Sequence, residues 1–198
     1  MRIVFQETPT KVYTGGNRMC FYEIYFSPTG GTKKVADAIA AGIDGDIRKI
    51  DLIKSPQEME KIVFTKEDLC LVAVPSYGGR VPGVVVEQLK QVKGNGAKVI
   101  LAAVFGNRHI DDTLLELSDT LKAAGFVCVA GIEAVAEHSL VHRFGAGRPD
   151  EKDIKELTGF GVKIRSALES GNGKEEPVFP GSHAYKIYNG VAIKPEVT

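Results

Sequence analysis

The stretch CFYEIYFSPTGGTKKVADAI, residues 20–39, joins two different sequence patterns across a short turn. Its first part, residues 20–26, is mostly apolar, as expected for a β-strand that is buried in a sheet. From Lys33 onward, apolar side chains recur at helical spacing. Between the two lies SPTGGT (27–32), which combines glycines with hydroxyl side chains. A strand, a glycine-rich turn and a helix in this order predict the first unit of a parallel α/β sheet.

The alternation of strand and helix patterns continues along the chain. Near-continuous apolar runs at 69–74 and 98–105 are typical of central strands that are covered on both faces. Because the segments between the strands have helical periodicity, we expect a doubly wound parallel sheet with right-handed crossovers. The predicted strands are residues 20–26, 46–53, 69–74, 98–105 and 126–135, and the predicted helices are residues 33–43, 84–92, 111–124 and 150–169.

Two segments lie outside this predicted domain, which spans residues 18–170. Residues 1–17 form an N-terminal extension, in which Arg2–Gln6 and Lys11–Thr14 either form a hairpin against a sheet edge or stay loose. Residues 171–198 begin with the linker-like GNGKEEP and then contain too many glycines and prolines for a helix. We therefore expect a linker followed by an extended tail over the surface of the domain.

The composition indicates a soluble globular protein that binds neither nucleic acid nor membrane. Hydrophobic residues make up 43% of the chain and charged residues 25%. The 25 basic residues balance 25 acidic ones, whereas a nucleic-acid-binding surface needs a basic excess. No apolar stretch approaches the ~20 residues that span a bilayer, and the N-terminus does not resemble a signal peptide. We expect a cytoplasmic protein.

The cysteines point to the same compartment. Cys20, Cys70 and Cys128 are far apart in the sequence, and each lies in an apolar run. We expect all three to be buried, reduced core residues and neither a disulfide set nor a metal site.

The turn after the first strand has the composition of a phosphate-binding loop. Its glycines, Gly30 and Gly31, let the backbone curl with N–H groups pointing inward, and Ser27, Thr29 and Thr32 add hydroxyl donors. The following helix places the positive end of its dipole at the same spot. Neither the lysine-containing nucleoside-triphosphate loop nor the G-x-G-x-x-G dinucleotide pattern occurs here. The alternative is a turn that only caps the helix, for which Thr32 is suited.

FSPTGGTKKVADAI resembles the phosphate-binding loop of the flavodoxins. Their hydroxyl–x–T–G–x–T pattern is matched at Ser27, Thr29, Gly30 and Thr32. The resemblance implies a flavodoxin-like α/β fold, with a five-stranded parallel sheet of strand order 2-1-3-4-5 in a three-layer α/β/α arrangement. It also implies FMN as the cofactor, with its phosphate held by this loop.

A second loop leaves the buried strand at 69–74. Tyr77 offers a flat ring for stacking on a flavin, and Gly78 and Gly79 let the backbone approach the ring and reorient at low cost. Ser76 completes the candidate cofactor-binding residues of this loop. The alternative is a plain tight turn with an exposed tyrosine. Arg80 either favours an anionic reduced flavin or points to solvent.

A third loop follows the strand at 98–105. Its candidate cofactor-binding residues are Gly106, Asn107 and Arg108. The Asn107 amide both donates and accepts hydrogen bonds, so it could read the pyrimidine edge of a flavin. We expect Asp111 and Asp112 to cap the next helix.

VFGNRHIDDTLLEL and AEHSLVHRFGAGRPDEKD resemble a narrower family, the flavodoxin-like half of bacterial and archaeal proteins that fuse this domain to a ferredoxin module. The resemblance implies a four-iron ferredoxin-type module or another redox protein as partner. A four-iron cluster needs about four thiolates, and the chain has no cysteine after Cys128. We therefore expect the cluster module to lie in a longer protein of which this chain is a part. His138 and His142 are expected to be structural or to lie at the rim of the flavin site.

These loops favour an electron-transfer flavoprotein in which no side chain acts as a general acid or base. An FMN-dependent NAD(P)H:acceptor oxidoreductase of the quinone-reductase type is an alternative, and so is a scaffold domain that has lost FMN. A phosphoacceptor receiver shares the strand order but needs acidic residues where this chain has Ser27-Pro28 and Pro75-Ser76.

Overall fold

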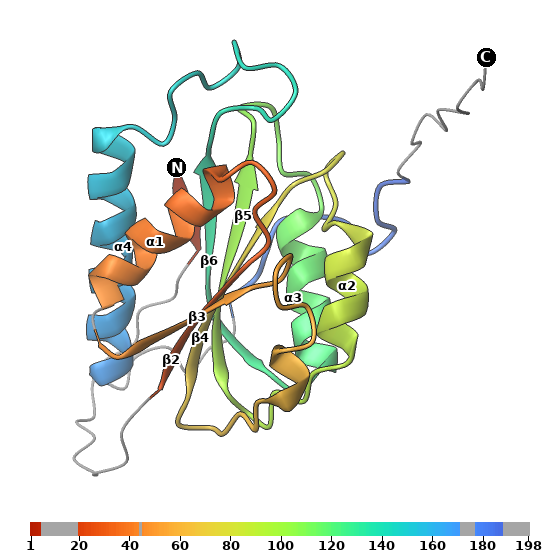
Figure 1. Ribbon diagram of the computed structural model, residues 1–198, viewed down its shortest axis with the longest axis vertical. Coiled ribbons are helices and arrows are strands. Elements are labelled where there is room, and N and C mark those ends of the chain that lie inside the picture. Colours follow the sequence, from red (N-terminus) through yellow and green to blue (C-terminus); the bar gives the residue numbers. More distant parts are fainter. Residues whose placement is uncertain (5–19, 44, 171–176, 188–198) are drawn as a thin grey trace.

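The computed structural model describes residues 1–4, 20–43, 45–170 and 177–187. They form three layers, with a central sheet covered by helices on both faces (Figure 1). The strands are β1 (Arg2–Val4), β2 (Phe21–Tyr25), β3 (Ile47–Asp51), β4 (Leu69–Pro75), β5 (Lys98–Phe105) and β6 (Val127–Val135). The helices are α1 (Gly31–Ile43), α2 (Gly83–Lys90), α3 (Thr113–Ala123) and α4 (Glu151–Glu169), with a short 3₁₀ turn, η1, at Met59–Lys61.

The sheet has the predicted parallel core and one additional strand. Its order is β1-β6-β5-β4-β2-β3, so the five parallel strands β2 to β6 follow the predicted order 2-1-3-4-5 and confirm the flavodoxin-like fold class. The short β1 pairs antiparallel with β6 at the sheet edge, Ile3 opposite Ile132. Its proposed hairpin partner, residues 11–14, lies outside the described residues.

Strand β2 lies where the strand order reverses. Phe21 is opposite Ile47 of β3 on one side and Leu69 of β4 on the other. Because all three strands are parallel, the loops that follow β2 and β4 emerge next to each other at the carboxyl edge of the sheet. Ligands of doubly wound folds bind at this type of position.

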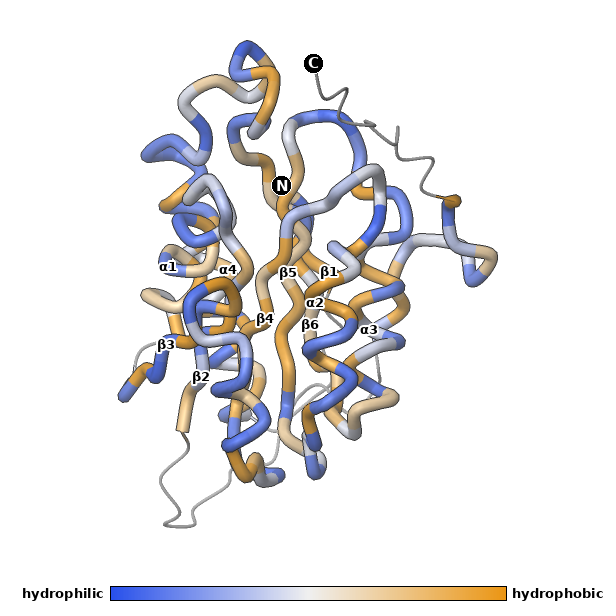
Figure 2. The backbone as a smooth tube through the Cα atoms, turned by 45° about the vertical axis from the view of Figure 1, so that its right-hand side comes forward, coloured by the Kyte–Doolittle hydropathy of each residue, from blue (hydrophilic) through white to orange (hydrophobic). Residues whose placement is uncertain are grey.

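Both faces of the central strands are buried. Leu71, Val72 and Ile100, from β4 and β5, have no exposed surface, and Figure 2 shows the hydrophobic residues concentrated along these strands. Cys70 and Cys128 lie in this core, as predicted. The prediction for Cys20 is wrong: this residue is exposed and comes just before the first residue of β2, at the end of the sheet.

Helices α1 and α4 cover one face of the sheet and touch through their backbones. A Cβ atom built on Gly42 would lie 2.0 Å from the Thr158 carbonyl oxygen, and one on Gly161 would lie 2.2 Å from the Ile39 carbonyl oxygen. No L side chain fits at either place without moving a helix. The contact therefore fixes how α1, which follows the SPTGGT loop, rests on the domain.

We expect Gly161→Ala to lower the unfolding free energy by about 2–4 kcal/mol, because its methyl group collides with the backbone of α1. Gly159→Ala is the matched control in the same helix, since a Cβ there meets nothing within 4 Å. The control should raise stability by up to about 1 kcal/mol through its better helix propensity. Urea denaturation measures both variants, and equal effects would contradict the close helix contact.

A buried carboxylate lies beneath α1. Glu23, in the middle of β2, has no exposed surface, and its Oε2 lies 3.1 Å from the Lys49 ammonium of β3. Lys49 also pairs with Asp37 of α1 at 2.5 Å. Burial raises the pKa of Glu23 from 4.5 to about 7; the Lys49 contact lowers it, and the charge of Asp37 adds to the increase. Glu23 therefore binds a proton more tightly in the folded than in the unfolded chain.

This shift makes stability depend on pH in a definite direction. The contribution of Glu23 is fully present below its unfolded pKa, 4.5, and is lost as the pH rises through its folded pKa, about 7. We expect Glu23→Gln, measured by urea denaturation, to gain about 1–3 kcal/mol over the wild type between pH ~4.5 and pH ~8. Glu169→Gln, at a side chain that is 63% exposed, is the control and should show no such trend. A gain that is constant with pH would argue against a buried, proton-binding Glu23.

The last described segment, Pro177–Ile187, packs on the opposite face, beside α3 (Figure 1). Phe179 is buried with 6% exposed surface, and a Cβ on Gly131 of β6 would lie 2.4 Å from its ring. We call residues 177–187 the C-terminal strap. None of the helices in the described ranges is long and apolar enough to cross a membrane.

Candidate functional site

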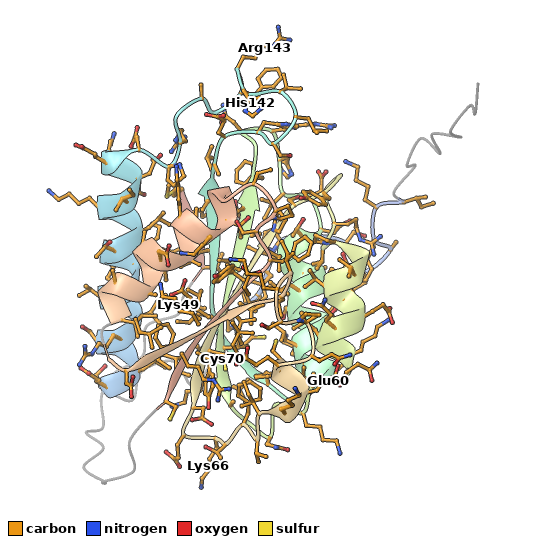
Figure 3. The ribbon with its side chains drawn as sticks, viewed as in Figure 1. Lys49, Glu60, Lys66, Cys70, His142 and Arg143 are labelled. Carbon is orange, nitrogen blue, oxygen red and sulfur yellow. The ribbon has the colours of Figure 1, made fainter. Side chains whose placement is uncertain are left out.

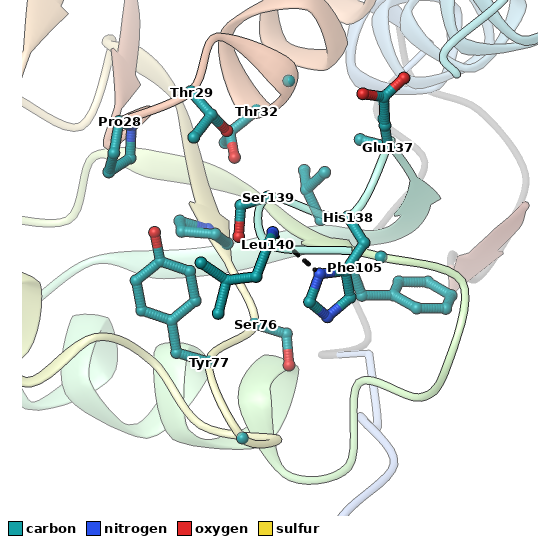
Figure 4. A pocket seen from close by; sticks show the side chains of 16 residues that line it. Pro28, Thr29, Thr32, Ser76, Tyr77, Phe105, Glu137, His138, Ser139 and Leu140 are labelled. Carbon is teal, nitrogen blue, oxygen red and sulfur yellow. Dashed lines mark hydrogen bonds between the residues drawn. The ribbon is translucent and has the colours of Figure 1, made fainter. Parts of the chain in front are cut away.

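A cavity of about 470 Å³ opens at the carboxyl edge of the sheet, where the chain leaves β2, β4, β5 and β6. Its size falls within the range of small-molecule sites. Figure 4 shows Thr29 and Thr32 at one side of the pocket, with Tyr77, Leu140 and His138 across from them. The lining residues are Pro28, Thr29, Gly31, Thr32, Pro75, Ser76, Tyr77, Gly78, Val104, Phe105, Gly106, Ala136, Glu137, His138, Ser139 and Leu140.

The first wall is the turn that leads into α1. Gly30 has a φ of +87°, a conformation that glycine adopts without strain. The capping contact of α1 comes from Ser27, whose Oγ accepts a hydrogen bond from the Lys33 amide at 2.9 Å. The amides of Gly31 and Thr32 precede the first intrahelical hydrogen bond, and no hydrogen bond within the described part of the chain uses them. This end of the pocket therefore offers neutral donors at the positive end of a helix dipole.

The second wall is a tight turn after β4. Tyr77 and Arg80 exchange two backbone hydrogen bonds, of 3.0 and 3.2 Å. Gly78 and Gly79 between them both have positive φ, 62° and 85°, which is the pattern of a type I′ turn. The Tyr77 side chain is 37% exposed, and desolvation raises the pKa of its phenol. The hydroxyl therefore stays protonated at neutral pH.

Arg80 does not simply point to solvent, and its proposed effect on a reduced flavin stays a prediction. Its guanidinium forms two hydrogen bonds with the Glu116 carboxylate of α3, at 2.8 and 2.6 Å. Glu116 is a buried residue, so its negative charge requires a partner. Arg80 is thus part of the support behind the turn.

The third loop contributes less to the pocket than the sequence suggests. Gly106 lines it, and a Cβ at this position would lie 2.6 Å from the ring of His138. Asn107 and Arg108 do not line the pocket, and Asn107 has a φ of 59°. Their expected contact with a flavin stays a prediction.

The capping role predicted for Asp111 and Asp112 is wrong. Asp112 occupies the N-cap position of α3 without a side-chain capping hydrogen bond. Its carboxylate accepts hydrogen bonds from the amides of Ser182 and Lys186 in the C-terminal strap. The Asp111 carboxylate pairs with the Lys186 ammonium at 2.5 Å. Contacts with the strap, about 70 residues later in the sequence, have replaced the capping hydrogen bond within α3.

The fourth wall is the segment after β6, which sequence reasoning had only partly included. His138 lines the pocket, and its Nδ1 accepts hydrogen bonds from the amides of Leu140 and Val141, both at 3.1 Å. The Glu137 carboxylate accepts from the Gly147 amide and contacts the His142 ring; both contacts lower the pKa of Glu137. Figure 4 shows this carboxylate turned away from the centre of the pocket.

Beyond these residues the loop runs outward. His142 and Arg143 lie at its far end (Figure 3). Leu140 and Phe144 are exposed by 83% and 45%. The signal that could have assigned this loop to the site is its position after the fifth parallel strand, since every such loop leaves from the same sheet edge.

Of the twelve residues predicted to bind a cofactor, the structure gathers seven around one pocket. These are Thr29, Gly31, Thr32, Ser76, Tyr77, Gly78 and Gly106. The other five, Ser27, Gly30, Gly79, Asn107 and Arg108, lie in the same loops but outside the lining. Among the described residues, no group of three or more His, Cys, Asp or Glu side chains could hold a metal ion.

The chain was compared with protein family models, curated proteins and solved structures. No protein family model matches the chain, and no curated protein matches it. Several solved structures do match it. An archaeal flavodoxin is similar at 16% identity and a TM-score of 0.54, over 76% of this chain and 99% of that one. A Fusobacterium nucleatum flavodoxin bound to flavin mononucleotide is similar at 14% identity and a TM-score of 0.51, over 79% and 99%.

The third comparison is with an enzyme. The apo form of an NADH:FMN oxidoreductase is similar at 16% identity and a TM-score of 0.54, over 75% of this chain and 89% of that one. At such identities the similarity concerns the fold. The chain has the flavodoxin-like fold, and its pocket lies where that fold binds ligands.

Proposed function

We propose that this chain binds one FMN in the pocket at the carboxyl edge of the sheet and transfers electrons through it. The observation that carries the proposal is the pair of amides of Gly31 and Thr32, which no hydrogen bond within the described residues uses, at the start of α1. Both residues line the pocket, and so does Thr29. Helix N-termini with free amides bind phosphate groups, and the flavodoxin with this fold from Fusobacterium holds flavin mononucleotide.

The residues present suit the two chemically different ends of FMN. Thr29, Gly31 and Thr32 would hold the phosphate, with Gly30 setting the curve of the loop. Tyr77 and Gly78 would line the ring, because an aromatic face and an open backbone suit a flat heterocycle. The proposed contact of Asn107 with the polar edge of the ring rests on its residue type and its place in the chain.

Bound FMN supplies the redox chemistry, and the protein supplies its binding and surroundings. No side chain of the pocket needs to act as a general acid or base in electron transfer. The partner that we propose is an iron–sulfur module of the ferredoxin type or another redox protein. The alternative, an NAD(P)H:acceptor oxidoreductase, is favoured by the fold it shares with the NADH:FMN oxidoreductase.

We expect the FMN-free protein to quench flavin fluorescence on titration, with one site per chain. Thr29→Val and Thr32→Val each remove one hydroxyl while keeping the side-chain shape. Because a hydrogen bond to a charged group contributes about 1.5–3 kcal/mol, each variant should weaken FMN binding by about tenfold or more.

Riboflavin, which lacks the phosphate, makes this test specific. Both variants should bind riboflavin as the wild type does, since the lost hydroxyls would face the phosphate. Thr120→Val is the control, because its hydroxyl donates within α3 to the Glu116 carbonyl oxygen at 2.7 Å. Equal losses for FMN and riboflavin would remove the phosphate from the proposed position, and no uptake of either flavin by the wild type would end the proposal.

A direct assay separates the carrier from the enzyme. We expect the FMN-loaded protein not to oxidise NADH or NADPH in the presence of a quinone, but to accept electrons from a flavoprotein reductase. Steady consumption of either nucleotide would select the oxidoreductase.

A further inference from the structure

We propose that Arg80 is a positioning residue and that, with the C-terminal strap, it holds the Tyr77–Arg80 turn in place for the flavin ring. The inference rests on the proposed function and assigns the strap a part in it. Arg80 would act without touching FMN, through the contacts behind the turn.

All three guanidinium nitrogens of Arg80 donate a hydrogen bond, and Arg80 does not line the pocket. Two of its nitrogens donate to Glu116, and the third donates to the carbonyl oxygen of Lys186 in the strap at 2.7 Å. Its carbon lies 4.8 Å from the ring centroid of Tyr185, also in the strap. Arg80 therefore joins the turn, α3 and the strap in one polar cluster.

Glu116 also binds the backbone at the end of the turn. Its Oε2 accepts a hydrogen bond from the amide of Val81 at 2.9 Å, in addition to the bond from the Arg80 side chain. The backbone and the side chain at the end of the turn are thus fixed to the same carboxylate, and Glu116 is buried. Charge-assisted, paired hydrogen bonds of this kind define a position more sharply than neutral ones.

Asp112 links the strap directly to the turn. Its carboxylate accepts from the amides of Ser182 and Lys186 at 2.8 and 2.6 Å, while its own amide donates to the Gly79 carbonyl oxygen at 2.9 Å. The neighbouring Asp111 packs so closely on Gly79 that a Cβ there would lie 2.3 Å from its carboxylate oxygen. A displacement of the strap would therefore reach the turn through three residues. Arg80 binds the Lys186 carbonyl oxygen, and Asp111 and Asp112 each contact both the strap and Gly79.

The side chains within the turn add little to define its position. Gly78 and Gly79 have no side chains to pack, and the Tyr77 ring is 37% exposed. A ligand site whose wall must be ordered at each binding event loses affinity, whereas a wall held in advance does not. The strap, together with Glu116 and Asp112, thus preorganises the turn that would line the flavin ring.

Arg80→Lys and Asp112→Asn test this inference, because both keep the size of the side chain while weakening the cluster. Arg48→Lys is the matched control: Arg48 also pairs with a glutamate, Glu58, at 3.0 Å, and lies 5.9 Å from a tyrosine ring centroid, that of Tyr22. We expect both test variants to weaken FMN and riboflavin by the same factor, about three- to tenfold, and to shift the midpoint potential of bound FMN. Arg48→Lys should leave both quantities unchanged.

Amide hydrogen exchange of the FMN-free protein gives a readout that does not require flavin. Exchange at Arg80 and Val81 should accelerate by about tenfold in both test variants, with amides of β4 and β5 unaffected. Unchanged exchange and flavin affinities in both variants would overturn the inference while leaving FMN binding intact. If the wild type takes up no flavin, the proposed function fails, and the exchange data still decide whether the cluster holds the turn.

Discussion

The position of β2 between β3 and β4 is the constraint on which the rest of the structure depends. Ile24 pairs with Ile50 on one side and with Val72 on the other, all in parallel register. The chain therefore has to leave β2 and β4 at the same sheet edge, next to each other. The glycine-and-hydroxyl turn after β2 and the glycine turn after β4 thus form two walls of one pocket. Two loops about 50 residues apart in the sequence, residues 27–32 and 75–80, are brought together by the pairing of β2 with β4.

Most of the fold could be predicted because its signals are local. The apolar runs of β4 and β5 are nearly continuous and led to their bounds within one residue. The signal for the start of α4 is also local. Asp150 and Asp153 form a reciprocal capping box within the first turn of the helix. The short β1 was harder to foresee, since three residues carry little periodicity and the strand exists only through its pairing with β6.

The errors at the site share one physical cause, because each concerns a polar side chain with two acceptable partners. An aspartate before a helix satisfies the rule for a cap, yet Asp112 binds the amides of the strap, which no local pattern can foresee. Arg80 could face solvent, and instead it pairs with the buried Glu116. The error at Cys20, which lies outside the site, has another cause: the residue belongs to an apolar run but comes one residue before β2. Residue type restricts what such a side chain can do, and tertiary contacts choose among the options.

The charge of the pocket lining has a consequence for how an anion would be held. No lysine or arginine is among the lining residues, although Lys33 and Lys34 follow the loop directly. The ammonium of Lys33 is engaged with Asp37 at 2.6 Å and lies 5.6 Å from the centroid of the Tyr25 ring. A phosphate at the start of α1 would thus be bound by amides, hydroxyls and the helix dipole at hydrogen-bonding range. Such contacts are short and directional, so salt screens them much less than it screens exposed ion pairs. A site of this kind discriminates by the shape and hydrogen-bonding capacity of the anion more than by its charge.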